Sequence, residues 1–135
     1  MKDCCDLHVH SVFSDGTLTP TQLIAESERL GLKAVALTDH NTIAGMKEFL
    51  QAAKNSSVDA VAGVEISTDY NGVELHILGL FLAEKDFDTV TEYVKRYNIR
   101  KEQSNIELVE MLRKAGYDIE LTRTIANHVS IPVIA

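Results

Sequence analysis

Two histidines separated by a single residue stand near the N-terminus, in the sequence His8-Val9-His10. Side chains two residues apart in a β-strand point to the same face, so both imidazoles can reach one point in space. Asp15, next to Gly16, follows closely enough to fold back toward that point. Imidazole and carboxylate donors gathered in this way suit Mn²⁺, Fe²⁺ or Zn²⁺. The spacing therefore predicts a metal site at one end of the first strand.

Three further candidate ligands stand at or near the ends of predicted strands. His40 directly follows an apolar strand, Glu65 lies near the end of the next one, and His76 lies in a fourth. Functional residues collect at the C-terminal ends of the strands in α/β sheets and barrels. We therefore expect one metal centre, whose ligands are His8, His10, Asp15, His40, Glu65 and His76.

The acidic residues of this set have different expected tasks. Glu65 stands in an apolar strand, where an unpaired charge is costly to bury, so it needs a metal ion or an ion pair. Asp39 could cap the helix that follows it or hydrogen-bond to a histidine ligand. We assign Asp15, Asp39 and His40 to the catalytic set. A carboxylate such as Glu65 can bridge two metal ions. Two ions about 4 Å apart activate a water and neutralise the charge that builds up on a phosphoryl group, so the predicted chemistry is phosphoester hydrolysis.

Alternating strands and helices are expected to position these ligands. Runs of apolar residues predict strands at residues 4–9, 33–38, 58–66 and 74–82. A capping box at Thr19 predicts a helix that ends at Gly31, and Thr42 is the expected cap of a second helix up to Lys54. The sequence Tyr70-Asn71-Gly72 predicts a tight turn, so the third and fourth strands are expected to pair antiparallel.

The last third of the chain differs from the rest in its amino-acid composition. Residues 86–115 are rich in Glu, Lys and Arg and predict a helix, with a bend or break expected at residues 98–105. A further short helix is expected to end near Val129. The sequence thus divides into a β/α part, residues 1–84, and a small helical lobe, residues 85–135.

Composition excludes several classes of protein. A chain of 135 residues with 45% hydrophobic residues suits one domain, and its net charge of −7 argues against stable binding to duplex DNA. Bound cations could still attract a phosphorylated substrate. The sequence has neither a signal peptide nor an apolar run of the ~20 residues that span a membrane. Cys4 and Cys5 are adjacent, a spacing that disfavours a disulfide between them, and we expect both to be buried. Because cysteines without disulfides are usual in reducing compartments, we expect a cytoplasmic protein.

The predicted strands leave the sheet with an open edge. Proteins normally cover or pair such an edge, and the chain ends on the apolar residues 131–135. We expect a truncated chain, with a natural fragment and an obligate oligomer as alternatives. Self-association would then occur through the open edge of the sheet.

The motifs resemble those of the PHP (polymerase and histidinol phosphatase) superfamily. His8-Val9-His10 with Ser14-Asp15-Gly16 matches its first motif, and Leu37-Thr38-Asp39-His40 matches its second. Residues 63–67 and 75–79 resemble the next two blocks, so the resemblance covers about residues 5–82. The branch most similar is that of small metal-dependent phosphoesterases acting on nucleoside phosphates and the 5′ ends of short RNA.

The resemblance implies an α/β fold, namely the N-terminal portion of a distorted (β/α)₇ PHP barrel followed by a small helical insertion lobe. It also implies that His8, His10 and Glu65 hold one ion, that Asp15 and His40 hold a second, and that Glu65 with His76 holds a third. These two or three divalent ions would be Mn, Fe or Zn. Later histidines and an Asp-x-His element complete the family's site, so we expect a partial site and weak or absent activity from this chain alone.

The leading hypothesis is a metal-dependent phosphoesterase that hydrolyses phosphate monoesters or diesters of nucleotides or short oligonucleotides. Its expected partner is a phosphorylated small molecule or the 5′ end of a short RNA. Two alternatives stay open. One is a catalytically inactive metal-binding fragment or interaction module, and the other is a polymerase-associated PHP domain, which the lack of a basic face disfavours.

Overall fold

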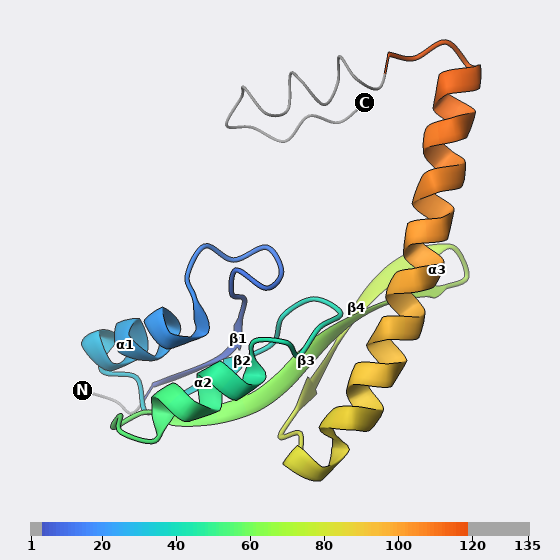
Figure 1. Cartoon of the computed structure of the whole chain (residues 1–135). Coiled ribbons are helices and arrows are strands. Elements are labelled where there is room, and N and C mark those ends of the chain that lie inside the picture. Colours follow the sequence, from blue (N-terminus) through green and yellow to red (C-terminus); the bar gives the residue numbers. More distant parts are fainter. Residues whose placement is uncertain (1–3, 119–135) are drawn as a thin grey trace. The chain divides into compact units, whose positions relative to one another are not determined.

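The computed structural model describes residues 4–118 and contains one four-stranded sheet with the strand order β1-β2-β3-β4 (Figure 1). The strands are β1 (Cys5–Val9), β2 (Ala34–Leu37), β3 (Asp59–Tyr70) and β4 (Val73–Leu80). The helices are α1 (Pro20–Leu30), α2 (Met46–Ala53), the 3₁₀ turn η1 (Glu84–Asp86) and α3 (Phe87–Lys114). The chain forms two compact units, Met1–Tyr97 and Asn98–Ala135, and the sheet with α1 and α2 belongs to the first.

The first helix begins and ends where the sequence predicts. The Thr19 hydroxyl accepts a hydrogen bond from the Gln22 N–H at 3.2 Å, and the Gln22 side chain accepts one from the Thr19 N–H at 2.9 Å. Pro20 occupies the first turn, where its missing N–H costs nothing. Gly31 ends the helix at a φ of 74°, in the left-handed region that favours glycine. These local signals fix the two ends of α1.

The second helix begins three residues later than predicted, because Gly45 rather than Thr42 occupies the N-cap position. Thr42 does not cap it, because its hydroxyl accepts a hydrogen bond from the Ala44 N–H, and the helix begins at Met46 after Gly45. Asn41 has a φ of 50°, which turns the chain away from a helical path directly after β2. The prediction of a helix start at Thr42 is therefore wrong. The extra residues form the connection between the end of β2 and α2.

The third strand pairs with β2 over its first third and with β4 over the rest of its length. Residues 59–62 of β3 pair in parallel with β2, and residues 63–70 pair antiparallel with β4. A Cβ on Gly63 would lie 2.9 Å from the Gly79 carbonyl oxygen and 2.9 Å from the Thr38 methyl group, so only glycine fits at this crossing. Asn71 and Gly72 form the predicted turn with φ values of 55° and 77°. The antiparallel hairpin is confirmed.

The hydrophobic core contains residues from the sheet, from helices α1 and α2 and from the first part of α3, where Val94 is buried (Figure 1). Its largest buried members are Phe49, Leu37, Met46 and Val35. Val9 of β1 and Val64 of β3 pack into the same core. Because successive side chains of a strand alternate between faces, the neighbours of these valines project from the opposite face of the sheet.

Two further expectations are corrected by the structure. Cys4 and Cys5 are exposed rather than buried, because they stand at the start of β1, an edge strand of the sheet. The α3 helix runs from Phe87 to Lys114 without the break expected at residues 98–105, since polar residues on an exposed helix need no core contacts. The short helix expected up to Val129 lies outside the described residues.

None of the helices within residues 4–118 combines the length and the apolar character needed to cross a membrane. The expected division into residues 1–84 and 85–135 stays a prediction.

Candidate metal centre

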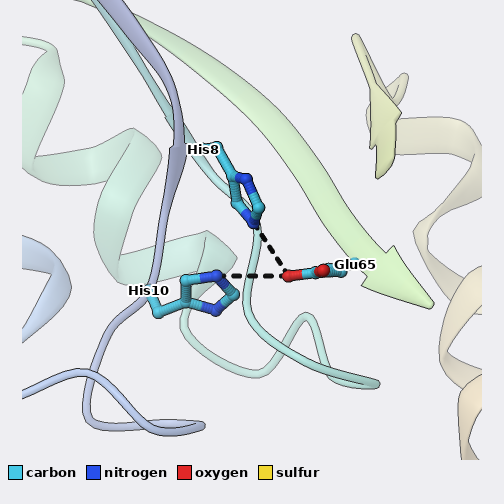
Figure 2. Close-up of side chains that lie close together, drawn as sticks. All are labelled: His8, His10 and Glu65. Carbon is cyan, nitrogen blue, oxygen red and sulfur yellow. Dashed lines mark hydrogen bonds and ion pairs between the residues drawn. The ribbon is translucent and has the colours of Figure 1, made fainter. Parts of the chain in front are cut away.

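The carboxylate of Glu65 is the point at which four histidines converge. Its Oε2 lies 2.9 Å from Nε2 of His8, 3.2 Å from Nε2 of His10 and 3.5 Å from Nδ1 of His40. Its Oε1 lies 3.1 Å from Nδ1 of His76. Figure 2 shows the rings of His8 and His10 directed at this carboxylate. Glu65 itself is only 4% exposed, so it forms the floor of the centre.

The register of the sheet brings these side chains together. Val9 packs into the core, so His8 and His10, one position to either side of it, face the opposite side of the sheet. In β3 the core residue Val64 likewise directs the adjacent Glu65 to that opposite face. These three side chains therefore meet on the face of the sheet opposite the core.

Backbone pairing holds His40 and His76 against Glu65. A parallel bridge joins His40 to Glu65 just beyond the end of β2, where the Asn41 N–H donates to the Glu65 carbonyl at 2.8 Å. His76 lies on β4 opposite Ser67, one pleat along from Glu65 on the same face. Asn41 and Ser67 fix this arrangement, because the Ser67 N–H donates to the Asn41 amide oxygen and the Asn41 amide donates to the Ser67 hydroxyl, both at 3.0 Å.

Asp15 joins the cluster from the loop after β1. Its Oδ1 lies 3.4 Å from Nδ1 of His10, and its Oδ2 lies 3.7 Å from Nε2 of His40. The loop turns sharply at Gly16, where a Cβ would lie 2.1 Å from the His10 carbonyl oxygen. Glycine is required here because the backbone passes too close to itself for any side chain. The loop therefore returns Asp15 to the histidines, as the spacing predicts.

Electrostatic interactions keep the Glu65 carboxylate ionised. Burial by itself would raise the pKa of Glu65, because it penalises the charged form. The hydrogen bond from His8, the electrostatic interactions with His40 and His8 and the hydrogen bond from His76 outweigh that penalty and lower the pKa of Glu65 below its ordinary value. An ionised carboxylate is the form that binds a cation.

The donor set fits divalent transition metals. Three groups of side chains each place one donor atom per residue within 4.8 Å of the others, namely His8–His10–Glu65, His10–Asp15–His40 and His40–Glu65–His76. Nδ1 of His40 is buried without a hydrogen-bond partner, which is the state of a nitrogen directed toward a ligand site. His10, His40 and Glu65 each belong to two groups, so neighbouring ions would share ligands.

The structure brings together all six ligands predicted from the sequence, but not Asp39. Asp39 is absent from the three donor groups, and its buried carboxylate binds Ser11 and Ser14 instead. It does not cap α2 either, because that helix follows Gly45 and has no side-chain cap. Its catalytic role stays a prediction. Sequence reasoning missed Ser11 as a supporting residue, since a lone serine between two motifs carries no signal of its own.

Comparison with known families supports this reading of the geometry. The family model described as PHP domain matches residues 6–133, nearly the whole chain. The chain belongs to the PHP domain family. The resemblance stated from the sequence motifs is thereby confirmed.

Several curated relatives of this PHP domain are phosphoesterases. The chain is 40% identical over 111 residues to a 5′-3′ exoribonuclease of Haemophilus influenzae, covering 82% of this chain and 40% of that protein. It is 30% identical over 122 residues to a phosphoribosyl 1,2-cyclic phosphate 1,2-diphosphodiesterase of Eggerthella lenta, covering 89% of this chain and 46% of that protein. The chain thus spans less than half the length of these relatives.

Solved structures confirm the fold. An amidohydrolase from Chromobacterium violaceum, solved with bound sulfate and no metal, aligns with a TM-score of 0.71 at 30% identity over 84% of this chain and 39% of that chain. A proposed metal-dependent phosphoesterase from Bifidobacterium adolescentis aligns with the same TM-score at 29% identity over 84% of this chain and 40% of that chain. The predicted fold class, the N-terminal portion of a PHP barrel followed by a helical part, is therefore confirmed.

Proposed function

We propose that this PHP domain is the metal-binding part of a phosphoesterase that hydrolyses phosphate esters of nucleotides or short oligonucleotides. The observation that carries the proposal is the buried, ionised Glu65 carboxylate in contact with four histidines, with Asp15 beside two of them. Such a set of nitrogen and carboxylate donors without thiolates is typical of catalytic rather than structural metal sites.

Each donor group has a task in this proposal. His8, His10 and Glu65 would hold one ion, His10, Asp15 and His40 a second, and His40, Glu65 and His76 a third, with Mn, Fe or Zn as candidates. Divalent ions bound there would neutralise the charge that develops on a phosphoryl group and activate the attacking water. The chain's own residues hold the donors in place, and the shared ligand Glu65 sets the distance between two of the groups.

The accessibility of the centre suits a phosphorylated substrate. The side chains of His8, His76 and Asp15 are 48%, 40% and 67% exposed, whereas the Glu65 side chain is 6% exposed. The centre thus has a buried floor and an open rim, which a phosphate group can approach. The sulfate bound to the structural relative and the nucleotide or RNA substrates named for the curated relatives support a phosphoester of this class.

Hydrolysis assays with matched variants test the proposal. Mn²⁺-dependent phosphate or nucleotide release is measured with a nucleoside 3′,5′-bisphosphate, a nucleoside monophosphate and a short 5′-phosphorylated RNA. Glu65→Gln removes the central charge and is expected to abolish turnover, whereas Glu48→Gln, which changes a carboxylate bound to Thr21, is the control. The proposal fails if none of the substrates is hydrolysed in a metal-dependent way by the full chain or by a longer protein that contains it.

A second candidate function is a metal-binding module of a larger protein without turnover of its own. The chain is 45% identical over 64 residues to an error-prone DNA polymerase of Nocardia farcinica, covering 46% of this chain and 6% of that protein. That similarity favours a PHP domain as one part of a larger polypeptide. Stoichiometric Mn²⁺ binding without hydrolysis by the longer protein supports this alternative over the first.

Location and self-association belong to the same proposal. A cytoplasmic location is supported by the exposed cysteines Cys4 and Cys5, which form no disulfide, as is usual in reducing compartments. Self-association through β4 is supported by Val73, Leu75 and Ile77, which are exposed on this edge strand. Sedimentation velocity over a range of concentrations tests it, and a monomer at the highest concentration contradicts it.

A further inference from the structure

The Asp39 carboxylate is buried but belongs to none of the three donor groups. Asp39 is 1% exposed. Its Oδ1 accepts hydrogen bonds from the Ser11 N–H at 2.6 Å and from the Ser14 hydroxyl at 2.7 Å, and its Oδ2 accepts one from the Ser11 hydroxyl at 2.6 Å. Three short bonds to N–H and O–H donors offset the cost of burying the charge. Both oxygens are therefore engaged with the loop that follows β1.

That loop, residues 11–16, is folded around Ser11. The Ser11 carbonyl accepts hydrogen bonds from the N–H groups of Ser14 and Gly16, both at 3.0 Å. The Ser14 hydroxyl lies 3.5 Å from Nδ1 of His10 and 3.4 Å from Oδ1 of Asp15. Ser14 thus contacts two candidate ligands while it donates to Asp39.

The backbone of Asp39 is fixed to β3 at the same time. Its carbonyl accepts a hydrogen bond from the Glu65 N–H at 3.2 Å. Asp39 therefore connects the strand that carries the central carboxylate with the loop that carries Asp15. By contrast, the Asp15 side chain is 67% exposed, and its contacts with His10 and His40 are 3.4 Å and 3.7 Å long.

We propose that Asp39 is a positioning residue, whose hydrogen bonds to Ser11 and Ser14 hold Asp15 where it completes the donor group of His10 and His40. Residues that hydrogen-bond around a metal site orient its ligands, and their loss commonly weakens metal affinity 10–100-fold. The inference deepens the proposed function and rests on its metal centre. It does not depend on which phosphoester is hydrolysed.

The chain offers a matched control for the proposal. The Glu28 carboxylate accepts hydrogen bonds from the Ser57 N–H and the Ser57 hydroxyl, both at 3.0 Å. A carboxylate therefore also holds a serine of another loop against α1 through two hydrogen bonds, at a place where none of the donor groups lies. Glu28→Gln and Ser57→Ala test the effect of losing such carboxylate–serine hydrogen bonds when no metal ligand depends on them.

The experiment is a calorimetric titration of the full metal-free chain with Mn²⁺. The Asp15→Asn variant identifies the bound ion that depends on Asp15. Asp39→Asn and Ser14→Ala are expected to lower the affinity for that ion about 10–100-fold. The affinity for the ion held by His8, His10 and Glu65 is expected to stay unchanged. Ser14→Thr retains the hydroxyl and is expected to restore binding. The control variants at Glu28 and Ser57 are expected to bind Mn²⁺ like the wild type.

Three results would overturn the inference. In the first, Asp39→Asn and Ser14→Ala bind both ions as tightly as the wild type. In the second, they lower the affinity for both ions equally. In the third, Asp15→Asn changes the affinity for neither ion. Circular dichroism of each variant checks the fold, and if Asp39→Asn does not fold, Ser14→Ala decides. If a longer protein that contains this chain binds the metal but does not hydrolyse the substrates, the proposed function alone is contradicted, because the positioning of Asp15 is read from the titration.

Discussion

His40 and Glu65 meet through both backbone and side chain. A parallel β-bridge joins the two residues beyond the end of β2, and Nδ1 of His40 lies 3.5 Å from Oε2 of Glu65. The bridge places the histidine of one motif against the central carboxylate of another, 25 residues later in the sequence. Nδ1 of His40 is buried and makes no hydrogen bond there, so the pairing leaves an unused nitrogen at the centre. A divalent cation would use both groups at once.

Metal binding is expected to raise the thermal stability of the chain, and Glu65→Gln is expected to remove that effect. A ligand that binds only the folded state stabilises it by about 2.7 kcal/mol at a concentration 100 times its Kd. The wild type should therefore show a higher Tm with Mn²⁺ than with EDTA. Differential scanning calorimetry of both proteins in both buffers measures the change. An equal rise in Tm for Glu65→Gln would show that the ion binds elsewhere.

Gly16→Ala is expected to destabilise the fold by about 1–3 kcal/mol, because the new methyl group would overlap the His10 carbonyl and force the loop to move. Urea denaturation measures the change in free energy of unfolding. Gly79→Ala is the control, since a Cβ there would meet Val64 at an ordinary 3.5 Å. Similar losses in both variants would contradict the role of the close approach at Gly16.

Phe49→Ala is expected to lower the free energy of unfolding by about 3–5 kcal/mol, because the removed ring is fully buried between α2 and the sheet and leaves a cavity. Phe81→Ala removes the same ring from a position that is 74% exposed and should change stability by less than about 0.5 kcal/mol. Chemical denaturation of the two variants in parallel gives the comparison. A small loss at Phe49 would show that the core does not lie beneath α2.

The Glu28 carboxyl is expected to contribute to the acid sensitivity of the fold. The hydrogen bonds from the N–H and hydroxyl of Ser57 lower the pKa of Glu28 below its model-peptide value of 4.5, despite the opposing effect of desolvation. A carboxyl with a lowered pKa stabilises the fold above the unfolded-state value, and this contribution is lost as the pH falls below about 4.5 through the folded-state pKa. Glu28→Gln should therefore flatten the dependence of stability on pH in this range. Urea midpoints between pH 3 and 6 measure it, and parallel curves for both proteins would contradict it.

Much of the fold and of the cluster of candidate ligands could be predicted because the signals are local. The Thr19–Gln22 capping box fixes the start of α1, and Asn71-Gly72 fixes the hairpin turn, since each depends on residues that are neighbours in the chain. The alternation of a strand places His8 and His10 on one face. Such features need no knowledge of distant contacts. The predicted start of the second helix was wrong because Asn41 takes a φ of 50° and hydrogen-bonds to Ser67, 26 residues away, which the local sequence does not reveal.

The sequence by itself determined which residue types are available to a metal and on which strand each one stands. Only the tertiary structure decided how they are used. Asp39 and His40 are adjacent in one motif, yet the Asp39 carboxylate binds two serines while His40 faces Glu65. The physical reason is that a buried carboxylate takes the donors that surround it, and those donors come from strands and loops that meet only when the sheet has formed.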